Sequence, residues 1–294
     1  MIKAECSTIK TLPHVQNERW ELRIFPSSSG NYALKFYEPE EFRMGAYGWK
    51  LSLLKDGVDV SKEHPHFTEL THSSMPGVPC PNQLQPWSKD GSTITIPSWD
   101  GCVHLYNVIE RKKVASVKCG SAWIILWSPH SNQFLASTLR EHFLVSKDGN
   151  NLARLDLECP NLETPSFFWF AAKPWLGALS RQSPTSKPEL RIFNETTSAL
   201  LSTLELDSEK FVPYAAEQFR HLSRERFSLE VSKGRWAVGW LLDMWRFQSF
   251  DAVTNSLYLS IYRPTGISKR GLGGEVVPVE EVHVKFNLSF DSQI

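Results

Sequence analysis

Histidine and cysteine residues suited to metal binding gather in one stretch of the chain. Three histidines, His64, His66 and His72, precede Cys80. Structural zinc sites use such residues as ligands, usually in pairs at short, regular spacings. Here Pro65 stiffens the first histidine pair, and no pair of cysteines has a metal-ligand spacing. We therefore interpret these residues as solvated loop histidines, with a zinc site as the alternative.

A glycine-rich segment near the C-terminus could cradle a phosphate group. The sequence Gly271-Leu-Gly-Gly274 follows two basic residues, Lys269 and Arg270. A phosphate-binding loop needs a strand before it, a helix after it and a Gly-Lys-Ser/Thr ending, and none of these is predicted here. We interpret residues 263–275 as a mobile loop.

Basic residues gather between positions 220 and 235. They are Arg220, His221, Arg224, Arg226, Lys233 and Arg235. Acidic residues at positions 217, 225 and 230 interrupt them, which is typical of a solvated face. A contact with a peptide, a phosphate or RNA is the alternative, so we name Arg220 and Arg224 as candidate binding residues.

The overall charge argues against a sustained attraction to polyanions. The 294 residues include 32 Lys and Arg and 32 Asp and Glu, which gives a formal net charge of zero. Nucleic acid and anionic membranes are therefore not the expected partners. The five cysteines, an odd number, favour free thiols in a reducing compartment. Without an apolar leader or a run long enough to span a bilayer, we expect a cytoplasmic protein, monomeric on its own and free of cofactors.

Three tryptophans mark a repeat in the middle of the chain. Trp127 follows Trp87 after 40 residues, and Trp169 comes 42 residues later still. Each tryptophan has a bulky apolar residue at +7, an apolar residue at +9 and a small hydroxyl residue at +11. These sets are Ile94, Ile96 and Ser98, then Phe134, Ala136 and Thr138, then Leu176, Ala178 and Ser180. A period near 40 with alternating apolar positions is typical of the blades of a β-propeller.

A second pattern follows the tryptophan lines and predicts an outer β-ribbon. An aromatic residue precedes Asn or Asp in Tyr106-Asn107, Phe193-Asn194 and Phe250-Asp251. Residues 143–155 offer a shorter version of the same ribbon. The piece Leu22-Arg-Ile-Phe25 also recurs as Leu190-Arg-Ile-Phe193, 168 residues later, which is four times 42. We interpret this recurrence as a possible further blade.

Turn signals divide the rest of the chain. Lys-Asp-Gly occurs at 55–57, 89–91 and 147–149 and predicts tight hairpins, because glycine adopts a positive φ without steric cost. Another hairpin is predicted within residues 20–37. Residues 61–86 contain five prolines and predict a loop or an irregular edge segment.

The C-terminal third of the chain mixes an irregular insertion with further strands. We expect the insertion around residues 207–230, with a short helix or loop over 217–226, and a return to strand over 235–242. The alternating segment Glu281–Phe290 predicts a last strand that pairs with an N-terminal one and so removes sheet edges.

The segment Ser98-Trp-Asp-Gly-Cys-Val-His-Leu-Tyr-Asn107 resembles the centre of a WD repeat, S-x-D-G-x-V-x-L-W-D, and Trp127-Ser-Pro129 is similar to its W-S-P. The resemblance covers residues 87–206 and, more weakly, 235–262. The family's Gly-His dipeptide is missing, and Asp100 alone remains of its His/Ser/Trp/Asp network. The resemblance implies a divergent all-β propeller as a single domain over 1–294. Its four-stranded blades would number seven, with six as the alternative.

The resemblance and the lack of catalytic motifs favour a non-catalytic scaffold that binds a protein partner on a propeller face. The candidate contacts at predicted strand ends are Trp99, His130, Arg140, Glu141, His142, Trp175 and Arg181. The alternative is a propeller enzyme, a metal-dependent hydrolase or a lactonase-like protein, with its site in the central channel. Its candidate residues are Asp100, His142, Asp148 and Asp243. The fold alone does not decide between the two functions.

Overall fold

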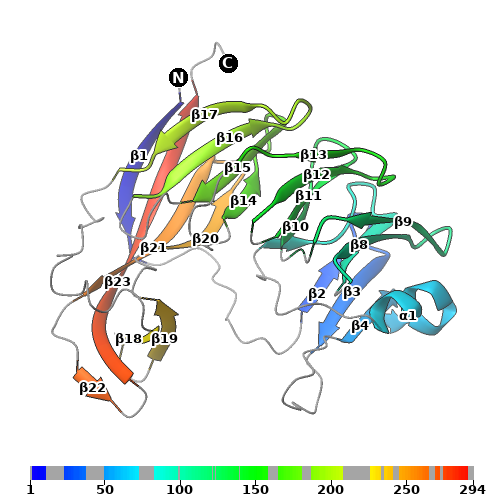
Figure 1. The fold of residues 1–294 in the computed structure, drawn as a ribbon, viewed down its shortest axis with the longest axis horizontal. Coiled ribbons are helices and arrows are strands. Elements are labelled where there is room, and N and C mark those ends of the chain that lie inside the picture. The colour runs from blue at the N-terminus through cyan, green and yellow to red at the C-terminus, as the bar shows by residue number, and fades with distance from the viewer. Residues whose placement is uncertain are drawn as a thin grey trace. The chain divides into compact units, whose positions relative to one another are not determined.

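The computed structural model describes most of the chain (Figure 1). The described residues are 2–10, 23–37, 50–72, 83–98, 100–120, 122, 124–138, 140–157, 165–180, 187–207, 226–232, 235–240, 245–264, 269–271 and 274–290. They fall into two compact units, one within residues 17–178 and 192–201 and the other within 1–16, 179–191 and 202–294. Both units are built almost entirely from antiparallel strands.

The first sheet confirms both hairpins predicted near the N-terminus. It contains β2 (Arg23–Pro26), β3 (Tyr32–Tyr37), β4 (Lys50–Lys55) and β5 (Val58–Asp59), in that order. The glycines of the three Lys-Asp-Gly sequences, Gly57, Gly91 and Gly149, have φ values of 81°, 69° and 75°. Only glycine adopts such values without strain, which is why this sequence marks the turns.

A helix occupies part of the segment predicted as a loop, so that prediction is wrong over residues 61–72. The 3-10 helix η1 (Ser61–Glu63) leads into α1 (Pro65–His72). Phe67 and Leu70, three residues apart, are both buried in the same core as the strands. Tertiary packing of this apolar stripe stabilises a helix too short to be stable alone.

The three tryptophan lines form the next three sheets, and each repeats the same up-and-down order. The second sheet contains β7 (Thr93–Pro97), β8 (Cys102–Asn107) and β9 (Lys112–Lys118). The third contains β10 (Ile124–Trp127), β11 (Gln133–Ser137), β12 (His142–Ser146) and β13 (Leu152–Arg154), with β6 (Leu84–Gln85) alongside β10. The fourth contains β14 (Ser166–Trp169), β15 (Trp175–Ser180), β16 (Glu189–Asn194) and β17 (Leu200–Glu205).

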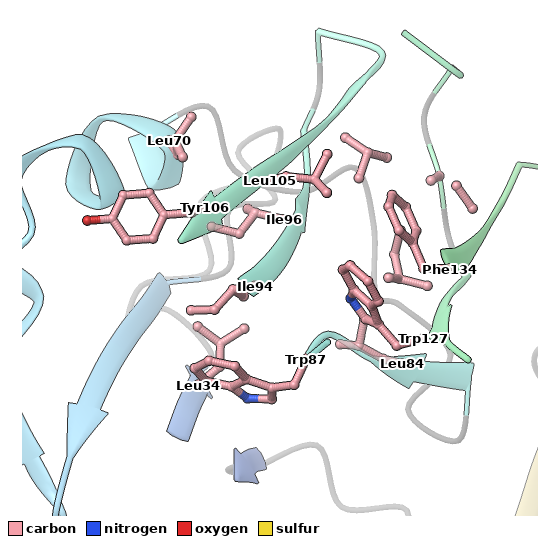
Figure 2. Packing of buried hydrophobic residues seen from close by; sticks show 14 of the residues in the cluster. Leu34, Leu70, Leu84, Trp87, Ile94, Ile96, Leu105, Tyr106, Trp127 and Phe134 are labelled. Atoms are coloured by element: carbon pink, nitrogen blue, oxygen red, sulfur yellow. The ribbon is translucent and has the colours of Figure 1, made fainter. Parts of the chain in front are cut away.

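The +7 spacing after Trp87 and Trp127 comes from hairpin pairing. Trp87 pairs with Ile94 and Trp127 pairs with Phe134 across the turn that joins the first two strands. Figure 2 shows these side chains in one apolar cluster, where Trp87, Ile94, Trp127 and Phe134 are all buried. The tryptophans are therefore core residues.

The tryptophans also link consecutive sheets by a repeated hydrogen bond. The indole N–H of Trp127 donates to the carbonyl of Pro86, the residue before Trp87, over 3.1 Å. The indole N–H of Trp169 donates to the carbonyl of Leu126, the residue before Trp127, over 3.3 Å. Each sheet thus bonds to the same point of the sheet before it. These bonds join consecutive sheets, and the stacking of one sheet on the next buries the apolar faces of both.

The aromatic–Asn/Asp pairs begin turns that the acidic or amide side chain caps. The Oδ1 atom of Asn107 accepts hydrogen bonds from the backbone of the second and third residues after it, and those of Asn194 and Asp251 do the same. The fourth residue after each one, Arg111, Ser198 or Asn255, has a positive φ. The alignment of these three ribbons is confirmed.

The match between Leu22–Phe25 and Leu190–Phe193 is coincidental. Residues 23–26 form the first strand of the first sheet, whereas residues 189–194 form the third strand of the fourth sheet. The two pieces therefore occupy different positions of the repeat.

The first strands of three consecutive sheet repeats lie close together. β6, which continues to Trp87 and so precedes β7, pairs in parallel with β10 through Leu84–Ile125 and Gln85–Leu126. The buried amide of Gln83 bonds to both the N–H and the carbonyl of Phe167 in β14, over 2.6 and 2.9 Å. The amide of Gln83 therefore forms with the backbone of β14 the two hydrogen bonds that a paired strand would form.

The second unit centres on one long strand. β23 (Gly274–Phe290) pairs with β1 (Ile2–Ile9), β21 (Ser256–Pro264), β22 (Lys269–Gly271) and β18 (Arg226–Ser232). β19 (Arg235–Trp240) pairs with β18, and β20 (Trp245–Asp251) pairs with β21. The pairing of Ile2–Ile9 with His283–Phe290 confirms the predicted closing strand.

Strands occupy parts of the two segments that the sequence predicted to be irregular. Residues 226–230 of the predicted insertion belong to β18, and residues 208–225 lie outside the described residues. The predicted mobile loop over 263–275 contains the end of β21, all of β22 and the start of β23. Backbone pairing with β23 overrides the glycine content of this segment. The fold is therefore all-β and propeller-like, and the number of blades stays a prediction.

Candidate partner-binding surface

Two turns of neighbouring sheets carry predicted site residues, and both approach Gly120. One turn joins β7 to β8 and contains Asp100, and the other joins β11 to β12 and contains Arg140 and Glu141. We call this region the Arg140 surface. It consists of Asp100, Gly101, Gly120, Thr138, Arg140 and Glu141.

Gly120, which follows β9, lies close to both turns. The carbonyl of Gly101 accepts hydrogen bonds from the N–H groups of Cys119 and Gly120, over 3.2 and 2.9 Å. Gly120 has a φ of 81°, and a Cβ atom there would lie 3.2 Å from Cγ2 of Thr138. Glycine at position 120 therefore allows the second turn to approach the first.

Thr138 fixes the backbone that displays Arg140. Its Oγ1 accepts hydrogen bonds from the N–H groups of Arg140 and Glu141, over 3.2 and 2.9 Å. Its N–H donates to the carbonyl of Glu141 over 2.8 Å. Arg140 itself is exposed, and no described residue forms an ion pair with it. Glu141 differs, because Arg154 lies 3.6 Å from its carboxylate.

Asp100 adds a negative charge to the same surface. Its Oδ1 accepts a hydrogen bond from the N–H of Cys102 over 2.9 Å. Partial burial raises the pKa of Asp100, but bonds from Cys102 and Ser98 outweigh it and hold that pKa below its usual range. The carboxylate is half exposed and ionised at neutral pH.

At the strand ends away from the Arg140 surface, polar side chains of the turns form contacts between neighbouring sheets. Lys147 of the β12–β13 turn forms an ion pair with Asp90 of the turn before β7. Ser131 donates a hydrogen bond to the buried carboxylate of Glu195 in the β16–β17 turn. His130 Nε2 lies 2.6 Å from the carbonyl of Phe170. These turns therefore contribute to intersheet contacts, which leaves the Arg140 surface as the better candidate.

Two residues predicted to contact a partner, His142 and Trp175, are buried. His142 is 1% exposed, and its Nδ1 lies 2.8 Å from Oγ of Ser137 on the paired strand. Burial lowers the pKa of His142 to about 4. Trp175 is also buried, with Nζ of Lys173 lying 4.2 Å from its ring centroid. Trp99, Arg181, Arg220 and Arg224 lie outside the described residues.

The residues proposed for metal binding or catalysis do not converge within the described part of the chain. His64 is buried, and its Nδ1 lies 2.9 Å from the hydroxyl of Tyr106, while His66 is exposed. Asp100 and His142 lie at one end of the strands and Asp148 lies at the other, and Asp243 is outside the described residues. Within the described part of the chain, no group of three His, Cys, Asp or Glu side chains could hold a metal ion.

Sequence reasoning missed one arrangement that resembles catalytic chemistry. Nδ1 of His104 lies 2.7 Å from Oγ of Ser116, and its Nε2 lies 3.5 Å from Asp100. The same pairing of histidine with a serine directly opposite recurs at Ser137–His142 and Ser260–His283. We therefore interpret it as a cross-strand contact of these sheets. No local signal could have found it, because it depends on strand register.

The comparisons with known proteins show distant structural likeness and no family. No protein-family model matches the chain, and no curated protein matches it. The structure of U3-55K is 10% identical, with a TM-score of 0.34 over 42% of this chain and 38% of that one. The RRP9 WD40 repeats are 10% identical, with a TM-score of 0.34 over 41% and 37%.

A third solved structure, hydrazine synthase of Kuenenia stuttgartiensis, is 8% identical, with a TM-score of 0.46 over 86% of this chain and 60% of that one. The chain spans less than two-thirds of each of these three proteins. Likeness this distant carries no argument about function. None of the described helices is long and apolar enough to cross a membrane.

Proposed function

We propose that the chain is a non-catalytic scaffold that binds a protein partner through the Arg140 surface. The observation that carries this proposal is the display of Arg140. Its side chain is exposed and lacks an ion pair among the described residues, while Thr138 holds its backbone with two hydrogen bonds. A preorganised turn loses little conformational entropy on binding, so more of the contact energy becomes affinity.

The charges of the surface suggest which partner it fits. Arginine is enriched at binding hot spots, where its planar guanidinium pairs with carboxylates. Asp100 presents the opposite charge on the neighbouring turn. The expected partner therefore places an acidic group against Arg140 and a basic group against Asp100. Such complementarity selects the partner and sets its orientation more than it sets raw affinity.

The proposal is tested by affinity purification of the full chain with charge-reversal variants. We expect the wild type to recover a stoichiometric partner, and Arg140→Glu and Asp100→Lys each to reduce recovery by about tenfold, as loss of roughly 1.4 kcal/mol predicts. Lys89→Glu is the matched control, because Lys89 is exposed in a turn at the opposite ends of the strands.

A partner recovered equally by all three variants would show that the Arg140 surface does not bind it. Circular dichroism of each variant separates a lost contact from a lost fold. Exchange of Arg140 for a photo-cross-linking amino acid should capture the partner directly, and the same group at position 89 should not.

A further inference from the structure

The outer edges of the sheets differ in how they are protected against pairing with other chains. An edge strand presents unpaired N–H and carbonyl groups, and proteins blunt such edges with charges, bulges, short strands or covering elements. The seven-stranded sheet also has edge strands β19 and β20. Following the up-and-down order, the last strands of the five sheets are β1, β5, β9, β13 and β17. Four of them show one or more of these devices.

β9 is the most heavily protected. It carries exposed lysines at positions 112, 113 and 118, a β-bulge opposite Leu105 and Tyr106, and a packing contact with α1. β5 and β13 are two and three residues long. β1 carries exposed charges at Lys3 and Glu5. Each of these edges therefore opposes pairing with another strand.

Among the described residues, β17 shows none of these devices. It is six residues long, Leu200-Leu-Ser-Thr-Leu-Glu205, and its single charge comes at its end. Leu200 and Leu201 are 49% and 40% exposed. β16 pairs with one side of β17, and no described strand pairs with the other. Glu205 is itself offset by Lys187, 3.4 Å away.

We propose that two copies of this chain associate through β17, edge to edge and antiparallel about a two-fold axis. This surface is separate from the Arg140 surface. The proposed dimer differs from the monomer expected from the sequence.

A second copy of the chain fits this edge because β17 is complementary to itself. Opposite residues in an antiparallel pair share a face, so a two-fold axis through Ser202 places Leu200 opposite Leu204 and Leu201 opposite Thr203. In the same register Glu205 faces Ala199 of the partner copy, so no like charges meet. Such an isologous contact closes as a dimer and does not extend into a fibre.

The contact is small, so the dimer is expected to be concentration-dependent. Stable interfaces bury about 1,600 Å² in total, and one strand pair supplies only part of that. Main-chain hydrogen bonds would provide most of the attraction, as in other strand additions.

Sedimentation velocity of the full chain tests the proposal. Over about a hundredfold range of concentration, the wild type should move from monomer to dimer, as a weak, small interface predicts. Leu201→Lys places a charge on the pairing edge and should weaken dimerisation at least about tenfold. Leu152→Lys is the matched control, because Leu152 is similarly exposed on the three-residue strand β13. It should dimerise like the wild type.

Disulfide trapping provides a second readout. Ser202→Cys should form an intermolecular disulfide under mild oxidation, because cross-strand Cβ atoms lie about 4.5–5.5 Å apart and can approach disulfide distance. Peptide mapping must show two copies joined at position 202, since the chain also has an exposed Cys6. Leu152→Cys should form no such link. A wild type that stays monomeric at the highest concentration overturns the proposal, as does a dimer that Leu201→Lys leaves intact.

Discussion

His142 occupies a position that is apolar in the neighbouring sheets. The strands β4, β8, β12 and β16 occupy equivalent positions in four sheets, and counting back four residues from the end of each gives Leu51, Val103, His142 and Leu190. All four side chains are buried. The imidazole of His142 contacts Oγ of Ser137 over 2.8 Å and packs against the ring of Phe167. His142 is therefore a titratable group at a position where the other three sheets have a buried aliphatic residue.

This burial makes the stability of the protein sensitive to acid. Burial, with a smaller effect from Arg154, lowers the pKa of His142 from 6.5 to about 4. Between these pH values the unfolded chain binds a proton at His142 that the folded chain does not. The free energy of unfolding therefore has its full value above pH 6.5 and decreases as the pH falls toward 4. Linkage gives about 1.4 kcal/mol per pH unit across most of this window, or about 2 kcal/mol lost at pH 5.

Urea unfolding of the wild type and of His142→Leu at pH 7.5 and pH 5 measures this effect. The variant matches the residue type found at positions 51 and 190, and at pH 7.5 its free energy of unfolding should differ from that of the wild type by less than about 1.5 kcal/mol. At pH 5 the variant should have gained about 2 kcal/mol relative to the wild type. His64, which is also buried with a lowered pKa, is present in both proteins and cancels in the comparison. An equal pH dependence of the two proteins would refute the reasoning.

Three further predictions concern contacts that join the repeats, and equilibrium urea unfolding measures each. Gln83→Leu leaves the N–H and carbonyl of Phe167 without their side-chain partner and should cost about 2–5 kcal/mol, whereas exposed Gln85→Leu should cost little. Trp127→Phe removes the indole bonds to Pro86 and Thr95 and should cost about 2–4 kcal/mol; a cost below about 0.5 kcal/mol would contradict the role of this bond. Gly149→Ala combines a positive φ with a Cβ atom 2.7 Å from that of Ala115, and Gly57→Ala has the positive φ with no atom within 4 Å. The second should cost about 1–2 kcal/mol and the first at least about 1 kcal/mol more.

Local patterns in the sequence predicted most of the strands. The +7 spacing after Trp87 and Trp127 reflects pairing across a single hairpin, and the aromatic–Asn/Asp pairs reflect a side chain that caps its own turn. Both features depend on residues close together in the chain. The helix over 65–72 was missed because the prolines of this segment indicated a loop. Its apolar residues are buried against strands of two sheets, and the local composition does not show that burial.

The candidate site could be predicted only in part. The sequence placed Arg140, Glu141 and His142 at a strand end, which the structure bears out. Strand register then separates them, because Arg140 and Glu141 lie in the turn and His142 is the first buried residue of β12. A shift of one residue exchanges the two faces of a strand, and periodicity does not resolve it at a strand end.

The sequence by itself therefore determined the all-β class, the repeat and its turns, since these follow from side-chain alternation and from the φ values that glycine allows. Tertiary structure alone decided which distant groups meet: the amide of Gln83 with the backbone of Phe167, the carbonyl of Gly101 with Gly120, and the buried setting of His142. These contacts depend on how strands register and sheets pack. No residue pattern within one repeat encodes them.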